Sequence, residues 1–154
     1  MYTAEAFFTN YVLISTVCAW FVAQFLKMVT TLFKERVFKP SLLLFSSGGM
    51  PSSHSATVGA LCTSSAIQFG FGSFQFAVSA ILAMVVITDA MGVRWETGEQ
   101  SKVINKIVQK LFAGNPEDTE TALKELVGHT PLQVFMGVLV GIALPFIMLL
   151  IIKP

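Results

Sequence analysis

The segment Leu132–Ile152 reads LQVFMGVLVGIALPFIMLLII, a run without one Asp, Glu, Lys or Arg. A bilayer core about 30 Å thick needs about 20 apolar residues in a helix that rises about 1.5 Å per residue. The segment therefore predicts a membrane-spanning helix. Within it, Gly137-Val138-Leu139-Val140-Gly141 places small residues on one face, which favours close packing against another helix.

Three further uncharged runs predict three more crossings. Phe7–Leu26 is long enough by itself, whereas Ser55–Phe69 and Phe74–Thr88 reach the required length only with their polar, uncharged neighbours. Gly70-Phe71-Gly72-Ser73 separates the last two runs as a tight turn. We expect an all-α, polytopic membrane helical bundle that forms a single domain over residues 1–154, with spans at about 7–31, 52–70, 73–93 and 131–152.

The overall composition agrees with a membrane protein. Hydrophobic residues make up 54% of the chain and charged residues only 12%, against about a quarter charged in soluble domains. A net charge of +1 argues against a nucleic-acid partner, which normally needs a strong basic excess. Four helices make a thin bundle, so the chain is also a candidate homo-oligomer.

Between the third and fourth runs, residues 98–128 change character and predict an amphipathic helical hairpin. Its first arm has an apolar face and a lysine face at helical spacing, formed by Val103, Ile104, Ile107, Val108, Leu111 and Phe112 on one side and by Lys102, Lys106 and Lys110 on the other. Asn115-Pro116 begins the second arm and Gly128 ends it. We expect the hairpin to lie on the membrane surface.

The distribution of basic residues predicts the orientation. With four crossings, nearly every Lys and Arg falls in the two connections on one side, and only Lys153 lies on the other. The positive-inside rule then places both termini outside and the connections in the cytoplasm, in a membrane that we expect to be the bacterial cytoplasmic membrane.

The polar stretch Gly48-Gly49-Met50-Pro51-Ser52-Ser53-His54-Ser55-Ala56 lies where no charged residue occurs between Lys39 and Asp89. Glycines let the backbone expose N–H groups, and Pro51 favours the first turn of a helix. Serine hydroxyls can donate to an oxyanion, while His54 supplies a titratable nitrogen. The stretch predicts a phosphate site at a helix start.

The predicted topology brings five polar residues to the cytoplasmic face: Lys27, His54, Asp89, Arg94 and His129. A shared site explains this convergence. Two structural alternatives are that the charged residues only anchor helix ends at the interface and that the histidines only bond to carbonyl groups. Asp89 needs a partner, for which Arg94 or Lys27 is suited, in a structural ion pair or as an orienting group.

Two motifs carry a family resemblance. Pro51-Ser52-Ser53-His54 resembles the PSGH signature of the type-2 phosphatidic acid phosphatase superfamily, which includes the vanadium haloperoxidases. Gly128–Gly137, GHTPLQVFMG, resembles its third motif, in which a His is followed four positions later by an Asp. Together with Asp89–Arg94 and Gly98–Gln100, these segments are most similar to the divergent bacterial branch of YuiD-like membrane proteins, and the likeness covers nearly the whole chain.

The resemblance implies that His129 is the nucleophile that forms a phosphohistidine, and that His54 protonates the leaving alkoxide and later activates water. It also implies a clamp for the phosphate charge, with Lys27, Arg94, the Ser52 hydroxyl and the Ser53 and His54 amides as candidates. No metal and no cofactor are implied.

The chain departs from the superfamily pattern at four points. Gln133 stands where an acid receives the other N–H of the nucleophilic histidine, and an amide cannot stabilise an imidazolium as a carboxylate does. The first motif is absent in its usual form, which leaves Lys27 as the nearest basic candidate. Leu123 occupies the position of the third-motif arginine, and Ser53 replaces a glycine.

The preferred hypothesis is a membrane-embedded phosphatase that hydrolyses a lipid or prenyl phosphate monoester or diphosphate at the cytoplasmic face. The alternative is a non-catalytic lipid-phosphate-binding or assembly subunit in which Gln133 has abolished turnover. A small transporter or channel ranks last, because the outer halves of the predicted helices are almost entirely apolar.

Overall fold

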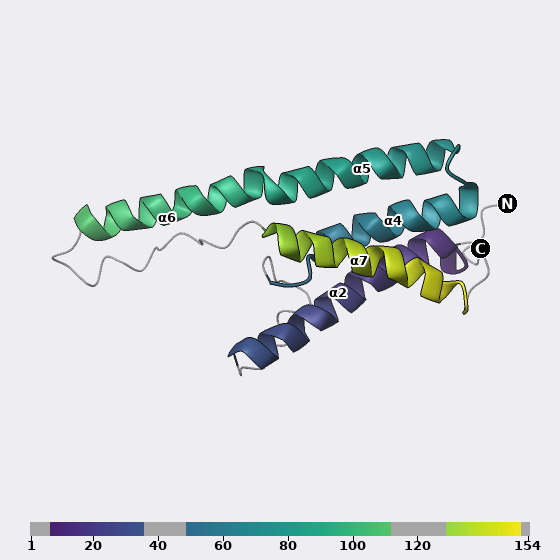
Figure 1. Ribbon diagram of the computed structural model, residues 1–154, viewed down its shortest axis with the longest axis horizontal. Helices are drawn as coiled ribbons and strands as arrows, with labels where there is room; N and C mark the ends of the chain where they lie inside the picture. The colour runs from purple at the N-terminus through teal and green to yellow at the C-terminus, as the bar shows by residue number, and fades with distance from the viewer. Residues whose placement is uncertain (1–6, 36–48, 112–128, 152–154) are drawn as a thin grey trace.

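The computed structural model describes residues 7–35, 49–111 and 129–151, and every regular element in these ranges is helical. The helices are α2 (Tyr11–Glu35), α4 (Ser53–Phe69), α5 (Phe74–Met91), α6 (Val93–Leu111) and α7 (Pro131–Met148). In Figure 1, α2, α4, α5 and α7 lie side by side as a bundle, and α6 extends beyond one end of it. The predicted all-α class is confirmed for the described part of the chain.

Three described stretches are long and apolar enough to cross a membrane: Tyr11–Phe33, Phe74–Val108 and Pro131–Met148. They correspond to the first, third and fourth predicted spans. The second, α4, has 17 residues, which rise about 26 Å and fall short of a bilayer core of about 30 Å. A crossing by α4 therefore stays a prediction.

Helix α4 is nevertheless the centre of the bundle, since it packs against α2, α5 and α7. Its buried side chains are small, which allows close approach on several sides: Ser53, Ser55, Ala56, Val58, Gly59, Ala60, Ser64 and Ser65. The Ser64 hydroxyl donates to the Ala60 carbonyl of the same helix at 2.6 Å, so its burial leaves no hydroxyl proton unpaired.

The closest helix contact lies between α4 and α7. A Cβ added to Gly141 would lie 2.5 Å from the Ala56 carbonyl oxygen and 2.9 Å from the Ala60 nitrogen, and one added to Gly137 would collide with the Ser52 carbonyl. The small-residue face predicted from the sequence is therefore the face that α7 presents to α4. At the far end of α7, the Tyr11 hydroxyl of α2 donates to the Pro145 carbonyl at 2.7 Å.

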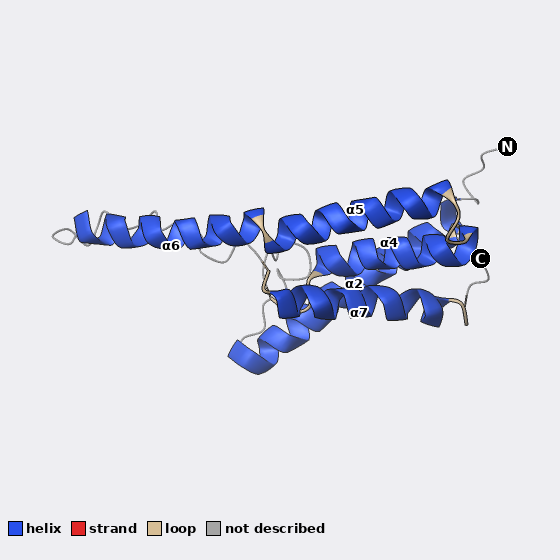
Figure 2. Ribbon diagram, turned by 45° about the horizontal axis from the view of Figure 1, so that its top comes forward, coloured by secondary structure: helices blue, strands red, loops and turns tan. Residues whose placement is uncertain are grey.

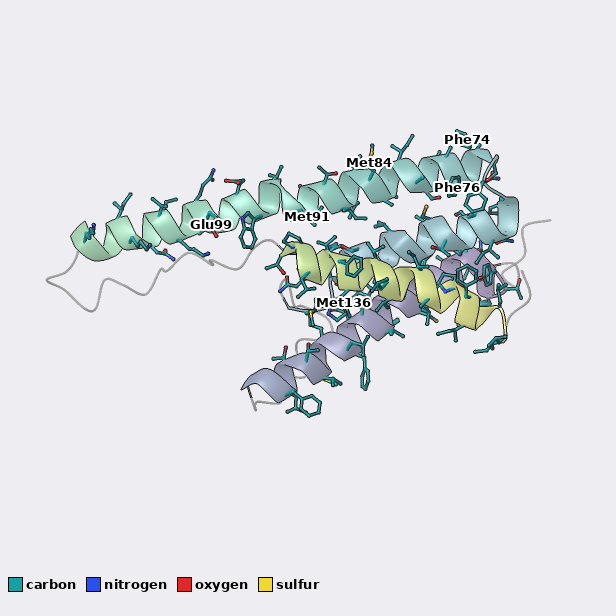
Figure 3. All side chains as sticks on the ribbon, in the orientation of Figure 1. Phe74, Phe76, Met84, Met91, Glu99 and Met136 are labelled. Carbon is teal, nitrogen blue, oxygen red and sulfur yellow. The ribbon has the colours of Figure 1, made fainter. Side chains whose placement is uncertain are left out.

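The outside of the bundle is apolar and its interior contains many polar groups, which is the reverse of a soluble fold. Phe21, Ile81 and Phe146 are each more than half exposed, whereas Ser15, Gln24 and Lys27 are buried. Figure 3 shows Met84 directed away from the other helices. This distribution supports lipid as the surrounding medium.

The helix of the amphipathic segment starts earlier than predicted, and its location on the membrane surface stays a prediction. Helix α6 begins at Val93, directly after α5, and continues in nearly the same direction away from the bundle (Figures 1 and 2). Only Gly92 intervenes, and helical hydrogen bonds continue through it, from Gly92 N–H to the Thr88 carbonyl and from Glu96 N–H to the Gly92 carbonyl. Residues 112–128, which include the end of the first arm and the whole predicted second arm from Asn115 to Gly128, lie outside the described residues.

Candidate active site

Three chain segments meet at the end of the bundle where α4 and α7 begin and α5 ends. The Ser52 N–H, just before α4, donates to the Gln133 carbonyl in the first turn of α7 at 2.9 Å. The His129 N–H donates to the Ala90 carbonyl in the last turn of α5 at 3.2 Å. Because both bonds join main-chain groups, the positions of these segments relative to one another are set by the backbone.

The two histidines, 75 positions apart in sequence, face the same recess at this end. Their ring centroids are 6.3 Å apart and the ring planes are inclined by 54°. The recess is lined by His54, Val86, Asp89, Ala90 and His129. The structure therefore brings three of the predicted site residues together, one from each of the segments described above.

The contacts of Gln133 determine which nitrogen of His129 carries a proton. The Thr130 N–H donates to Gln133 Oε1 at 3.2 Å, so the oxygen of the amide, not its NH₂ group, faces this corner. The same oxygen lies 3.1 Å from His129 Nδ1. An oxygen acceptor requires a proton on Nδ1, and in the neutral ring this leaves a lone pair on Nε2. With a proton on Nδ1, Nε2 is the ring nitrogen of His129 that can act as a base or a nucleophile.

The local sequence explains why this arrangement forms. Thr130 and Gln133 make a capping box at the start of α7, in which the Gln133 N–H donates to the Thr130 hydroxyl at 3.4 Å, and Pro131 follows as the first residue of the helix. His129 precedes this cap directly and is only 3% exposed. The residue that replaces the expected acid is therefore part of the helix cap and also the hydrogen-bond partner of the histidine.

The recess is small in this conformation. Its volume of about 10 Å³ is close to what one water molecule needs. His54 forms its outer wall and is exposed, whereas His129 forms the buried wall. The recess between these described residues is therefore smaller than a phosphate group.

The serines of the predicted phosphate loop have structural contacts of their own. Ser52 is the N-cap of α4, and its hydroxyl oxygen accepts the Ser55 N–H at 3.3 Å and the Ser55 hydroxyl at 3.0 Å. Ser52 and Ser53 are both buried and do not line the recess. Phosphate binding by Ser52 and Ser53 is implied by the family resemblance and stays a prediction.

Lys27 lies beside the same loop. It is 1% exposed, and a Cβ added to Gly49 would lie 3.1 Å from Lys27 Cγ, at a position whose φ of +99° already favours glycine. One turn further, the Thr30 hydroxyl donates to the Met50 carbonyl at 2.7 Å and fastens the loop to α2. Lys27 is not among the residues that line the recess, and its role in phosphate binding stays a prediction.

Thr30 was missed by the sequence reasoning. The available signal was its position three residues after Lys27, on the same face of the helix.

Arg94 is the second residue of α6, five positions after Asp89, and its side chain lies outside the described part of the structure. Across residues 7–35, 49–111 and 129–151, no three His, Cys, Asp or Glu side chains form a group that could hold a metal ion.

Comparison with known proteins identifies the family. The family model described as "Divergent PAP2 family" matches residues 8–144 of the chain. The chain belongs to the Divergent PAP2 family. It is also 43% identical, over 150 residues, to the "Uncharacterized membrane protein YuiD" of Bacillus subtilis (strain 168), covering 91% of this chain and 94% of that protein. No solved structure matches.

Membership of the Divergent PAP2 family confirms the predicted resemblance to a YuiD-like branch and supports location in a membrane. Both quoted motifs, residues 51–54 and 128–137, fall inside the matched region. The recess between the histidines is thus built from the segments that carry the resemblance.

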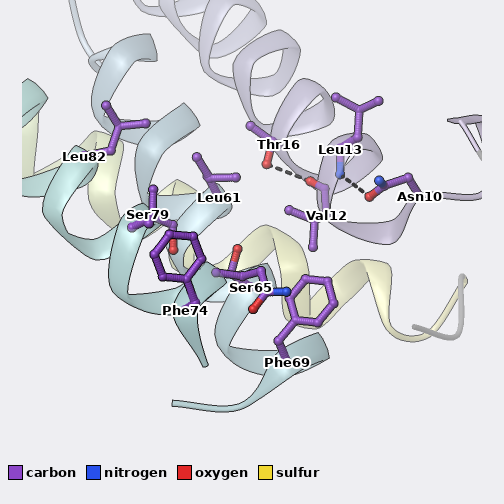
Figure 4. A pocket seen from close by; sticks show the side chains of 12 residues that line it. Asn10, Val12, Leu13, Thr16, Leu61, Ser65, Phe69, Phe74, Ser79 and Leu82 are labelled. Atoms are coloured by element: carbon purple, nitrogen blue, oxygen red, sulfur yellow. Dashed lines mark hydrogen bonds between the residues drawn. The ribbon is translucent and has the colours of Figure 1, made fainter. Parts of the chain in front are cut away.

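A larger cavity of about 430 Å³ lies at the other end of the bundle, between α2, α4 and α5 (Figure 4). Its lining is mainly apolar, with Val12, Leu61 and Phe74 among the walls, and includes no titratable side chain. Without an acid, base or strong nucleophile it cannot carry out acid–base chemistry. The smaller recess is therefore the candidate active site.

Proposed function

We propose that the protein is a membrane-embedded phosphatase that hydrolyses a lipid or prenyl phosphate monoester or diphosphate through a phosphohistidine on His129, with its site at the cytoplasmic face. The observation that carries the proposal is the orientation of His129, whose Nδ1 is bound by the Gln133 amide oxygen at 3.1 Å. Its other nitrogen is left with a lone pair, and the ring of His54 lies 6.3 Å away across the recess.

The two rings suit a two-step displacement. In the first step, the lone pair of His129 Nε2 forms a bond to phosphorus while the bond from phosphorus to the ester oxygen breaks, and protonated His54 gives its proton to the leaving oxygen. In the second step, neutral His54 takes a proton from water. The water oxygen then bonds to phosphorus, the N–P bond breaks, and inorganic phosphate leaves.

The charge of the transferred phosphoryl group also needs stabilisation. The N-terminal N–H groups of α4 begin next to His54, and a helix N-terminus favours an anion. Lys27 packs beside Gly49 in the loop before α4, and Arg94 follows Asp89 by five positions. We assign Lys27, Arg94, Ser52 and Ser53 to phosphate binding as part of the proposal.

The test is phosphate release by the purified protein in detergent micelles. Phosphatidic acid, phosphatidylglycerophosphate and a polyprenyl phosphate serve as substrates, and the His129→Ala variant serves as the control. We expect release by the wild type and at least a 100-fold lower rate for the variant, because the nucleophile is lost. Release that does not exceed the His129→Ala level for any of these esters would overturn the proposal.

A second candidate function is binding of a lipid phosphate without turnover. It is favoured by the neutral Gln133 beside His129 and by a recess with room for about one water. Binding of phosphatidic acid by the wild type, lost in His54→Ala and His129→Ala and not accompanied by phosphate release, would select this function over hydrolysis.

A further inference from the structure

Among the residues that the structure describes, Asp89 is the one carboxylate that lines the recess. It lies in the last turn of α5, is half-buried, and shares this helix face with Val86, one turn earlier, which also lines the recess. A carboxylate in this recess repels a phosphate substrate. It shares the recess with both imidazole rings, and an imidazole N–H is a suitable donor for a carboxylate.

His129 has no nitrogen to offer to Asp89. Its Nδ1 faces Gln133 Oε1 at 3.1 Å, and its Nε2 is the atom that must reach phosphorus. His54, on the opposite wall of the same recess, has one nitrogen for the leaving oxygen and one for a partner.

The geometry points to Asp89 as a positioning residue for His54, an inference that rests on the proposed phosphatase function. The carboxylate accepts the N–H of the His54 nitrogen that faces away from the substrate. It thereby orients the ring and favours its protonated form, as an adjacent anion does for any imidazole.

The two histidines then have different partners that suit different tasks. A nucleophile must be unprotonated at the attacking nitrogen, and the neutral amide of Gln133 binds the ring without favouring a second proton. A general acid must hold its proton until the leaving oxygen takes it, and a carboxylate favours this state. Gln133, at the position of the expected acid, thereby suits the nucleophile His129, and Asp89 suits the general acid His54.

The experiment compares two phosphate esters that differ in their need for a proton. Dioctanoyl phosphatidic acid releases an alkoxide, which must be protonated, whereas 4-nitrophenyl phosphate releases a stable phenolate. Both are offered to the full-length protein in micelles, and kcat/KM is measured, because it reports the step in which the ester oxygen leaves. We expect Asp89→Asn to lower kcat/KM for the lipid by about 100-fold and for the aryl ester by less than about threefold.

Further variants separate this role from a structural one. His54→Asn should show the same selective loss, the double variant should be no slower on the lipid than His54→Asn alone, and Asp89→Glu should recover part of the lost rate. Glu99→Gln is the matched control, since it also turns a carboxylate into an amide but in a pair with Lys102 on α6, at 2.6 Å. We expect it to leave both esters unaffected.

Three outcomes would overturn the inference. Equal losses on both esters in Asp89→Asn would show a general structural effect and leave the proposed function standing. Multiplicative losses in the double variant would show that Asp89 and His54 act independently. No hydrolysis of either ester by the wild type would overturn the proposed function and this inference with it.

Discussion

At the scale of single residues, Gln133 shows how this site departs from the acid that the family resemblance led us to expect. Its side-chain oxygen accepts the Thr130 N–H at 3.2 Å and faces His129 Nδ1 at 3.1 Å. One atom thus stabilises the start of α7 and selects the tautomer of the histidine. The substitution of an amide for an acid keeps the orientation of the ring while removing a negative charge from its side.

This dual role can be separated by two substitutions. Gln133→Leu removes both contacts, whereas Thr130→Ala removes only the hydroxyl half of the capping box. We expect both variants to lose roughly 1 kcal/mol in the free energy of unfolding. Only Gln133→Leu should also lower phosphate release, by about 10- to 100-fold, because the histidine loses the partner that orients it.

The measurements are thermal unfolding in micelles and initial rates on the lipid substrate. Equal rates for Gln133→Leu and Thr130→Ala would contradict the role assigned to the amide oxygen.

At the scale of elements, the contact between α4 and α7 positions the site. The two helices approach so closely that main-chain atoms of α4 meet the glycines of α7 directly. Since the Ser52 carbonyl contacts Gly137 and the Ser52 N–H binds the Gln133 carbonyl, the same contact holds the loop before His54 against the start of α7. Packing and site geometry are therefore coupled here.

Gly141→Ala tests this packing. The added methyl group would lie 2.5 Å from the Ala56 carbonyl oxygen, so the helices must separate. We expect the free energy of unfolding to fall by roughly 1–3 kcal/mol. Gly72→Ala is the matched control, because no atom lies within 4 Å of its added Cβ, and its unfolding midpoint in micelles should stay within about a degree of the wild type. Equal midpoints for the two variants would refute a close contact between α4 and α7.

The helices could be located from their uncharged runs, and the glycine face of α7 from the spacing of Gly137 and Gly141, because periodicity and composition are local properties. The central place of α4 was not predictable in this way, since it depends on which faces of three other helices it meets. The start of α6 at Val93 was missed because the third apolar run was extended to about residue 93 and the amphipathic pattern was assigned only from residue 98. In the structure, hydrogen bonds around Gly92 lead directly from α5 into α6.

The candidate site could be predicted from the sequence only in part. The motifs identified both histidines and Asp89, and the structure places these three around one recess. The Thr30 hydroxyl binds the Met50 carbonyl, which lies in a loop 20 positions away. The spacing from Lys27 indicates the helix face of Thr30, but no pattern in the sequence predicts this contact. The functional roles themselves stay predictions.

At the scale of the whole molecule, the bundle has two unlike ends. The histidine recess and the lysine-bearing helix α6 lie at one end, and the turn between α4 and α5 lies at the other, where Phe71 and Phe74 are largely exposed. With apolar side chains around the sides, this arrangement suits a protein that crosses a bilayer with its site on one side. The positive-inside rule predicts that this side is cytoplasmic.

Cysteine labelling tests the orientation and the crossing by α4 together. In a chain whose two free cysteines are replaced, Cys18→Ala and Cys62→Ala, a single cysteine is introduced by Gly72→Cys or by Lys106→Cys, both at exposed positions. A membrane-impermeant maleimide added to right-side-out vesicles should label the first variant and not the second. Labelling of both after permeabilisation is the control, and the opposite pattern in sealed vesicles would refute the predicted topology.

The bonds that hold His129 have a consequence for the peptide between Leu111 and Gly128. His129 is attached upstream to Ala90, and the residues after it are attached to Ser52, in each case through main-chain groups that no side-chain replacement deletes. These two bonds position His129 without relying on the length of the preceding connection. Lengthening that connection should therefore leave His129 in place, at an entropic cost of about 0.6 kcal/mol per doubling of its length.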